Sequence, residues 1–150
     1  MIELREIGLF GHLEHMEPML VDHWLALGKF PDLAPLKPDF ATVLALEEAG
    51  KVLSIGAFDG DELVGYSVNL VTSWMHSVDA LMCQNVVLWL DVRHRAGSNG
   101  LRLIRQTERL ARARGCGVFL LGARDDTTLF ELLPKLKYEV HETVYARVLS

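Results

Sequence analysis

Apolar and polar residues alternate along several stretches of the chain, a two-residue period typical of strands that bury one face. The tetrapeptide Asp59-Gly60-Asp61-Glu62 is a strong turn signal between two such stretches and predicts a hairpin. A short run over 118–121 is apolar throughout, as expected of a strand that is buried on both faces. We therefore expect six strands, over residues 2–7, 52–58, 63–71, 81–90, 118–121 and 138–148.

Helical spacing, with apolar residues three and four positions apart, separates these strands. It predicts helices over residues 12–27, 39–49, 101–114 and 127–136. Pro18 predicts a kink in the first helix or a break between two short helices. Pro31 and Pro35 predict a loop over 30–37, and the polar residues 72–80 predict an irregular segment.

The order of the elements, β-α-α-β-β-β-α-β-α-β, predicts the fold class. Residues 81–121 form a strand, a crossover helix and a strand, which implies a parallel pair, whereas the hairpin over 52–71 is antiparallel. We expect an α/β fold (α+β in some schemes) with a mixed, mostly antiparallel central sheet and helices on both faces. A length of 150 residues indicates a single domain over 1–150.

One stretch, residues 86–115, predicts a binding site for an anion. An apolar strand there runs into a loop with arginine and glycine, and the loop enters a long helix. The first N–H groups of a helix have no partner within it, and the helix dipole is positive at this end. Such a helix start suits phosphate or pyrophosphate.

Charge is unevenly divided along the chain, although the total is only −5. Residues 1–92 hold 14 acidic and 4 basic side chains, whereas residues 93–150 hold 6 acidic and 11 basic side chains. The basic half begins at the predicted anion site, and the acidic half favours a cationic second substrate. Many of these charges are equally well explained as solvated faces.

Three features bear on the compartment of the protein. No apolar run is long enough to span a membrane, and the N-terminus lacks the apolar region of a signal peptide. Cys83 and Cys116 lie in apolar contexts that suit a reducing compartment. We therefore expect a cytoplasmic protein without membrane contact.

Three segments carry a resemblance to a known family: Arg95-Ala96-Gly97-Ser98-Asn99-Gly100, the hairpin FDGDELVG over 58–65, and LPKLKY over 133–138. With them the chain resembles the GNAT superfamily of N-acetyltransferases. The family's cofactor motif is Arg or Gln, two residues, Gly, one residue, then Gly or Ala, and here Ser98 stands in place of the first glycine. A Rossmann-type nucleotide site fits less well, because its glycine-rich turn should follow the first strand.

The resemblance implies that acetyl-CoA is the co-substrate. Backbone N–H groups from Ala96 to Leu101 (Ala96, Gly97, Ser98, Asn99, Gly100 and Leu101) would hold its pyrophosphate, and Arg95 would be a further cofactor-binding residue. Leu88, Trp89 and Leu90 would pair through their backbones with the pantetheine arm. A backbone N–H near Trp89 or Leu90 would polarise the thioester carbonyl, and the amine would attack directly without an acyl-enzyme.

The catalytic residues are where the sequence departs from the family. The position of the usual Tyr acid holds Leu133, and that of a common Glu holds Asn85. His76 is our candidate base because imidazole titrates near neutral pH. Asn85 is a candidate for orienting a water or the amine, and Tyr145 and Tyr138 are candidate acids. An exposed loop histidine, a structural asparagine and buried tyrosines remain the alternatives.

Other residue patterns limit the partners. His12 and His15 share a helix face with Glu14 nearby, but no Cys or further His completes a set, so we expect no metal. A row of arginines, Arg102, Arg105, Arg109 and Arg112, follows one helix face. It suits a solvated face or the 3′-phosphate of the cofactor, and the acidic total argues against nucleic acid. A homodimer remains open.

Two functions from different classes fit these observations. The first is transfer of acetyl from acetyl-CoA to a primary amine, with a small cationic amine favoured and a protein amine as the alternative. The second is a non-catalytic protein of the same fold that binds acyl-CoA or a protein partner, which the replaced Glu and Tyr support.

Overall fold

The structure is a computed structural model that describes residues 1–28, 30, 32–33 and 35–149. The loop predicted over 30–37 includes Pro31 and Ala34, which lie outside the described residues. Within the described part, no helix is both long and apolar enough to cross a membrane.

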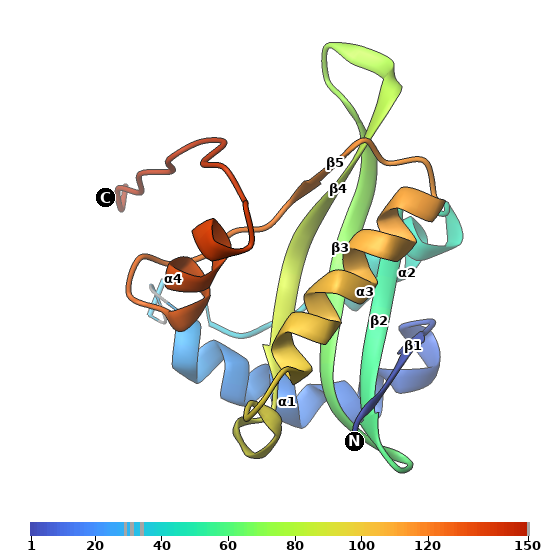
Figure 1. The fold of residues 1–150 in the computed structure, drawn as a ribbon, viewed down its shortest axis with the longest axis vertical. Helices are drawn as coiled ribbons and strands as arrows, with labels where there is room; N and C mark the ends of the chain where they lie inside the picture. The colour runs from blue at the N-terminus through green and yellow to red at the C-terminus, as the bar shows by residue number, and fades with distance from the viewer. Residues whose placement is uncertain (29, 31, 34, 150) are drawn as a thin grey trace.

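Five strands form one sheet in the order of the sequence (Figure 1). The strands are β1 (Glu3–Glu6), β2 (Val52–Asp59), β3 (Glu62–Trp74), β4 (Ser77–Leu90) and β5 (Val118–Leu120). The pairs β1–β2, β2–β3 and β3–β4 are antiparallel, and β4–β5 is parallel. The predicted mixed, mostly antiparallel sheet is confirmed.

Helices cover both faces of this sheet, as predicted. They are α1 (Leu13–Leu27), α2 (Phe40–Glu48), α3 (Asn99–Ala113) and α4 (Thr128–Lys135), with short 3-10 turns η1 (Phe10–His12) and η2 (Val92–His94). Pro18 lies inside α1, which continues through it as one helix. Asp39 caps α2, because its carboxylate accepts a hydrogen bond from the Thr42 N–H at 3.0 Å.

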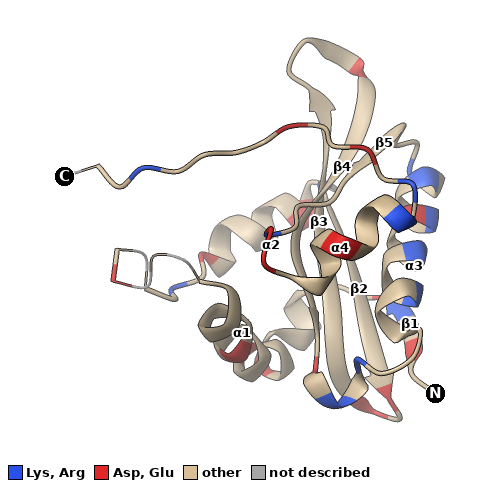
Figure 2. Ribbon diagram, turned by 60° about the vertical axis from the view of Figure 1, so that its left-hand side comes forward, with Lys and Arg blue, Asp and Glu red and all other residues tan. Residues whose placement is uncertain are grey.

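Two apolar clusters, one on each face, make up most of the core. On one face, Met16 and Met19 of α1 pack against Tyr66 and Trp89 of the sheet. On the other face, α3 contributes Leu103 and Ala111, which pack against a cluster that includes Leu53, Ile55 and Cys83. The 3.6-residue period of α3 therefore buries one side of the helix, and Arg105, Arg109 and Arg112 are exposed, in the row of basic positions that Figure 2 shows along α3.

Two sequence-based expectations are wrong. Residues 72–80 are not irregular, because β3 continues to Trp74 and β4 begins at Ser77, with Ser73 opposite Leu81. Backbone pairing extends the hairpin whatever the polarity of its side chains. In contrast, the described residues after α4 form no strand, although 138–148 alternates. A strand needs a neighbouring strand, and this segment has none within the described chain.

Candidate functional site

A β-bulge in β4 lies next to the point where β4 and β5 stop pairing, and we call the unpaired stretch beyond it the opening. Val87 pairs with Val68 and Asn85 pairs with Asn69, so Val86 is an extra residue without a partner on β3. The parallel pairing of β4 with β5 ends at Gln84, immediately before the bulge. Beyond this point the two strands diverge, and the chain after β5 runs towards α4 (Figure 1). Among the described residues, β4 therefore has no strand partner on this edge after the bulge.

The backbone groups at this open edge can be assigned. Asp91 donates its N–H to the Val64 carbonyl at 2.8 Å, so the backbone groups of Asp91 face β3. Because these groups alternate along an antiparallel strand, those of Trp89 also face β3, and those of Leu88 and Leu90 face the opening. The Leu90 carbonyl accepts a hydrogen bond from Arg95 Nε at 2.7 Å. Within the described chain, the N–H groups of Leu88 and Leu90 and the Leu88 carbonyl have no hydrogen-bond partner.

The start of α3 lies beside this edge and presents free donors. In the described chain, the backbone N–H groups from Ala96 to Leu101 donate to no acceptor, and the first helical bond runs from Arg102 N to Ser98 O at 2.8 Å. Gly97 has φ +72°, a left-handed conformation that favours glycine, whereas Ser98 has φ −100°. The glycine is therefore required at Gly97, and Ser98 is tolerated where the GNAT motif has glycine.

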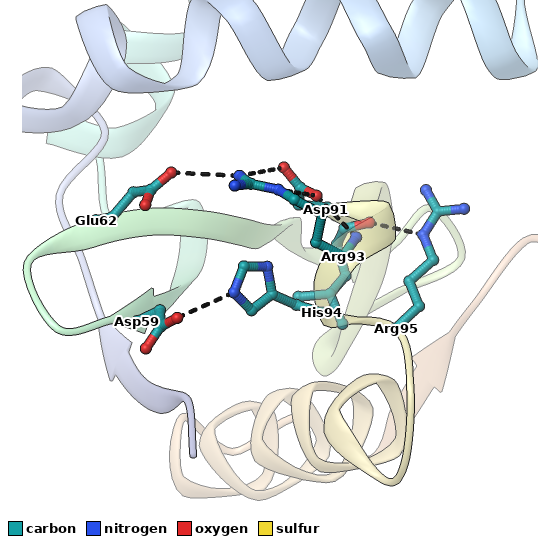
Figure 3. A network of polar contacts seen from close by, with 7 residues as sticks. Asp59, Glu62, Asp91, Arg93, His94 and Arg95 are labelled. Carbon is teal, nitrogen blue, oxygen red and sulfur yellow. Dashed lines mark hydrogen bonds and ion pairs between the residues drawn. The ribbon is translucent and has the colours of Figure 1, made fainter.

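Ion pairs tie this loop to the β2–β3 hairpin (Figure 3). The Asp91 carboxylate accepts hydrogen bonds from Arg93 N at 2.9 Å and from Arg93 Nη2 at 3.0 Å, and Arg93 also reaches Glu62 at 3.4 Å. His94 Nε2 lies 3.1 Å from Asp59 Oδ2. The Arg93 contacts lower the pKa of Asp91 to about 2. Exposed pairs of this kind add little stability, so we assign them a positioning role.

The sequence pattern does not predict this set of contacts. In the sequence, Asp59 and Glu62 are only turn residues, and Asp91 belongs to no motif. The spacing of Asp91 two positions before Arg93 is the one sequence feature that indicates part of this set. An Asp side chain often accepts a hydrogen bond from the backbone N–H two residues later.

A histidine from α1 also lies at the end of β4. His23 stacks on the Trp89 ring with 5.0 Å between centroids and an interplanar angle of 19°. The Arg95 guanidinium carbon lies 4.4 Å from the centroid of the same ring. Burial, and then the charge of Arg95, lower the pKa of His23 below its ordinary value. His23 is therefore neutral near pH 7. No sequence pattern pointed to it, because α1 and β4 are far apart in the chain.

Asn85 holds the bulge through its amide group. Asn85 Nδ2 lies 2.9 Å from Asn69 Oδ1 and 3.1 Å from the Val87 carbonyl, on the far side of Val86. The buried Ser67 hydroxyl joins the same network. These contacts give Asn85 a structural role at the opening. Its predicted role in orienting a water or the amine stays a prediction.

The structure does not bring the other two catalytic candidates to the opening. His76 is exposed in the turn between β3 and β4, nine positions before Asn85, which corresponds to about 30 Å of extended strand. Tyr145 is 91% exposed on the C-terminal segment, which leaves the sheet (Figure 2). In contrast, Leu88, Trp89, Leu90 and the loop from Arg95 to Leu101 lie together.

The remaining candidate acid, Tyr138, and part of the arginine row make contacts within the fold. Tyr138 donates its hydroxyl to Glu108 of α3, and burial raises its pKa above the ordinary value. Leu133 lies in α4, as the resemblance implied for the position of the usual Tyr. Along α3, Arg102 donates to the Ile2 carbonyl and Arg105 pairs with Glu108, so part of the arginine row is used within the fold.

Comparisons with known proteins bear on this arrangement. No protein-family model and no curated protein sequence matches the chain. Among solved structures, a ribosomal-protein-alanine N-acetyltransferase from Brucella melitensis biovar Abortus 2308 is 16% identical, with a TM-score of 0.75 and 100% of both chains covered.

Two further solved structures are similar over the same length. AAC(6')-Iy in complex with the bisubstrate analogue CoA-S-monomethyl-acetylneamine is 18% identical, with a TM-score of 0.72 and 100% of this chain and 99% of that one covered. A transcriptional regulator from Bacillus halodurans C-125 is 21% identical, with a TM-score of 0.76 and 99% and 100% covered. At these identities the likeness concerns the fold. Together with the bulge in β4 and the loop before α3, it shows that the chain has the fold of the GNAT N-acetyltransferases.

Proposed function

We propose that the chain is an acetyl-CoA-dependent N-acetyltransferase and that acetyl-CoA binds along the opening between β4 and β5. One observation carries the proposal: the unpaired N–H groups from Ala96 to Leu101 adjoin the unpaired edge of β4 at Leu88 and Leu90. The first set suits a pyrophosphate, and the second suits the amides of an extended arm. The free N–H groups of the loop and the free edge of β4 lie next to each other. A substrate such as acetyl-CoA, which carries a pyrophosphate and an extended arm with amides, needs this arrangement.

The loop supports the pyrophosphate end of this proposal. A Cβ added at Gly100 would meet no atom within 4 Å, so the backbone there is accessible. The positive end of the α3 dipole adds to the attraction of an anion. Arg95 does not need to contact the phosphate directly, because its guanidinium is held by the Leu90 carbonyl and the Trp89 ring. We assign Arg95 the role of positioning the loop against β4.

The direction of the backbone groups along β4 limits which N–H can polarise the thioester carbonyl. The Trp89 N–H faces β3, whereas the N–H groups of Leu88 and Leu90 face the opening. We propose that Leu88 or Leu90, and not Trp89, donates this hydrogen bond. Donors that are already oriented need no reorganisation as charge develops on the oxygen.

His23 is the side chain that we propose as the base for the ammonium proton. It lies on the α1 face of β4, and its lowered pKa keeps it able to accept a proton at neutral pH. Its ring packs on Trp89, which places it beside the strand that forms the opening. The leaving thiolate would take its proton from solvent, because Leu133 occupies the position of the usual acid.

The charge distribution favours a small cationic amine as the acceptor. Acidic residues lie on α1, whereas Lys and Arg concentrate along α3 (Figure 2). The α1 side would therefore attract a cation, and the α3 side would suit the anionic donor. Acetylation of a protein amine is the alternative acceptor class.

A non-catalytic acyl-CoA-binding protein is the second candidate function. The observation that favours it is that Asn85 and Leu133, which do not titrate, occupy the positions of the usual acidic and phenolic groups. The Asn85 amide is moreover held by the Val87 carbonyl and Asn69. In this candidate function the protein binds acyl-CoA at the proposed site but does not transfer the acetyl group to an amine.

Calorimetric titration with acetyl-CoA, followed by measurement of free CoA thiol with a panel of amines and peptides, tests both candidates. Gly100→Leu should weaken acetyl-CoA binding at least tenfold, because its side chain fills the start of α3. Gly8→Leu is the matched control, since Gly8 also has no atom within 4 Å of an added Cβ but lies before η1. Binding without turnover would favour the second candidate. Equal binding by both variants would refute the proposed donor site.

A further inference from the structure

The outer edge of β1 has no strand beside it in the described chain. β1 is the first strand in the sheet order and pairs only with β2. Ile7 donates its N–H to the Ser54 carbonyl at 2.9 Å, so the backbone groups of Ile7 face β2. Because these groups alternate along an antiparallel strand, those of Leu4 and Glu6 face outwards, and they have no backbone partner among the described residues. An extended segment of another chain can pair with such an edge.

Helix α3 lies along β1 and runs in the same direction. Near the start of both elements, Arg102 Nη2 donates to the Ile2 carbonyl at 3.0 Å. Near their ends, the Arg114 guanidinium pairs with the Glu6 carboxylate. Leu4, between these two contacts, packs against the core cluster on the α3 face of the sheet. The helix therefore follows the strand over its full length (Figures 1 and 2).

A groove of about 670 Å³ lies between the two elements, and arginines form one of its walls. Its lining comprises residues 1–4 on the β1 side and, on the α3 side, Arg102, Arg105, Gln106 and Arg109. Among the described residues no carboxylate pairs with Arg109, whose Nε donates to Gln106 Oε1 at 3.1 Å. Arg105 pairs with Glu108 through Nη1 at 2.9 Å, and its side chain is 53% exposed. Both arginines therefore keep N–H donors for an anionic partner.

The spacing of these two arginines matches that of alternate residues in a strand. Arg105 and Arg109 are four residues apart on a helix, which is about 6 Å along its axis. Residues two positions apart in an extended chain are about 6.6 Å apart and point to the same face. A strand added to β1 would therefore place every second side chain opposite an arginine. Carboxylates at these positions suit the guanidinium groups.

The other face of an added strand would meet a different environment. Glu3 and Arg5 point to the opposite face of the sheet from Leu4, because side chains alternate along β1. The Arg5 guanidinium is already used by the Glu3 carboxylate at 3.6 Å. A carboxylate on this face of the added strand would therefore be repelled by Glu3. Acidic residues at alternate positions fit better than a continuous acidic run.

We propose that the groove between β1 and α3 binds an acidic peptide segment of a partner protein, which adds as a strand to β1 and places alternate carboxylates against Arg105 and Arg109. The outward backbone groups of Leu4 and Glu6 supply the main-chain hydrogen bonds, and the arginines select the side chains. A nucleic acid fits less well, because its backbone has no N–H groups with which to continue a sheet. Two strands separate β1 from β4, so this surface is distinct from the opening.

Fluorescence anisotropy with labelled peptides tests the proposal on the full chain. The probe is a short peptide with glutamate at every second position and threonine between, and it should bind about tenfold tighter than a peptide of the same composition with contiguous glutamates. Methylation of the probe's backbone nitrogens should weaken its binding about tenfold, because the strand pairing is lost. Amide hydrogen exchange should slow at Leu4 and Glu6 when the probe binds. Equal binding of all three peptides, or tighter binding of a single-stranded oligonucleotide of equal charge, would overturn the proposal.

Variants of α3 identify the arginines that are used. Arg109→Gln should weaken binding of the probe about fivefold, the upper range for an exposed ion pair, and addition of Arg105→Gln should weaken it further. Arg112→Gln is the matched control, since Arg112 is also exposed on α3 but does not line the groove. It should bind the probe within a factor of two of the parent, as should the parent saturated with acetyl-CoA. Equal losses in Arg109→Gln and Arg112→Gln would indicate a general charge effect and refute the groove. Displacement of the probe by acetyl-CoA would place it at the loop before α3 and refute the proposal as well.

Discussion

Replacement of Gly97 by alanine separates the strain of a backbone turn from its role in binding. Gly97 has φ +72°, and Gly50, just after α2, also has φ +72°. An added Cβ meets no atom within 4 Å at either position. Both substitutions therefore impose the same strain without a steric clash. Only Gly97 lies in the loop that presents the free N–H groups.

The cost of each substitution follows from the backbone conformation. A left-handed conformation costs an L-residue about 1–2 kcal/mol. Alanine also lowers the conformational entropy of the unfolded chain, which stabilises the folded state by about 0.4–1 kcal/mol and offsets part of this cost. The net loss of about 1 kcal/mol lowers the melting temperature by about 2–4 °C in a chain of this length. We expect this loss for Gly97→Ala and for Gly50→Ala.

Binding should distinguish the two variants. Relaxation of the strained turn at Gly97 turns the N–H groups of Ala96 to Ser98 away from one another, and we expect acetyl-CoA to bind at least tenfold more weakly, about 1.4 kcal/mol. Gly50→Ala should bind within a factor of two of the parent. Calorimetry measures the binding constants. Thermal unfolding checks that the two variants lose the same stability. Equal binding at equal loss of stability would refute the assignment of this loop to the pyrophosphate.

Three further predictions concern stability and reactivity. Gly65→Ala should destabilise the protein by about 1–3 kcal/mol in chemical unfolding, because the added Cβ would lie 2.7 Å from Trp89 O on β4. The pKa of His23 is lowered in the folded state, so the free energy of unfolding should fall as the pH drops below about 6.5, and His23→Gln should flatten this dependence. Burial raises the pKa of Cys83 to about 12, so a thiol reagent at pH 8 should modify Cys116 first, as peptide mass spectrometry would show.

Local patterns determined most of the elements. The turn at 59–62, the cap at Asp39 and the loop from Arg95 into α3 depend on residues a few positions apart, so their sequence is sufficient to predict them. The loop before α3 was therefore predicted with its residues, including the unusual Ser98. The same local rules also produced the errors at 72–80 and 138–148, because pairing of strands depends on what lies beside them.

Tertiary structure decided where the opening lies and which side chains surround it. The bulge at Val86 comes from a shift in register between β3 and β4, and the end of β4–β5 pairing comes from the path of the chain after β5. The stacking of His23 on Trp89 joins α1 to β4 across more than sixty positions. Periodicity carries no information on such distant contacts, because it reports only which face of an element is buried. The sequence by itself thus determined the loop from Arg95 into α3, and only the fold placed that loop beside the unpaired edge of β4 and His23 beside Trp89.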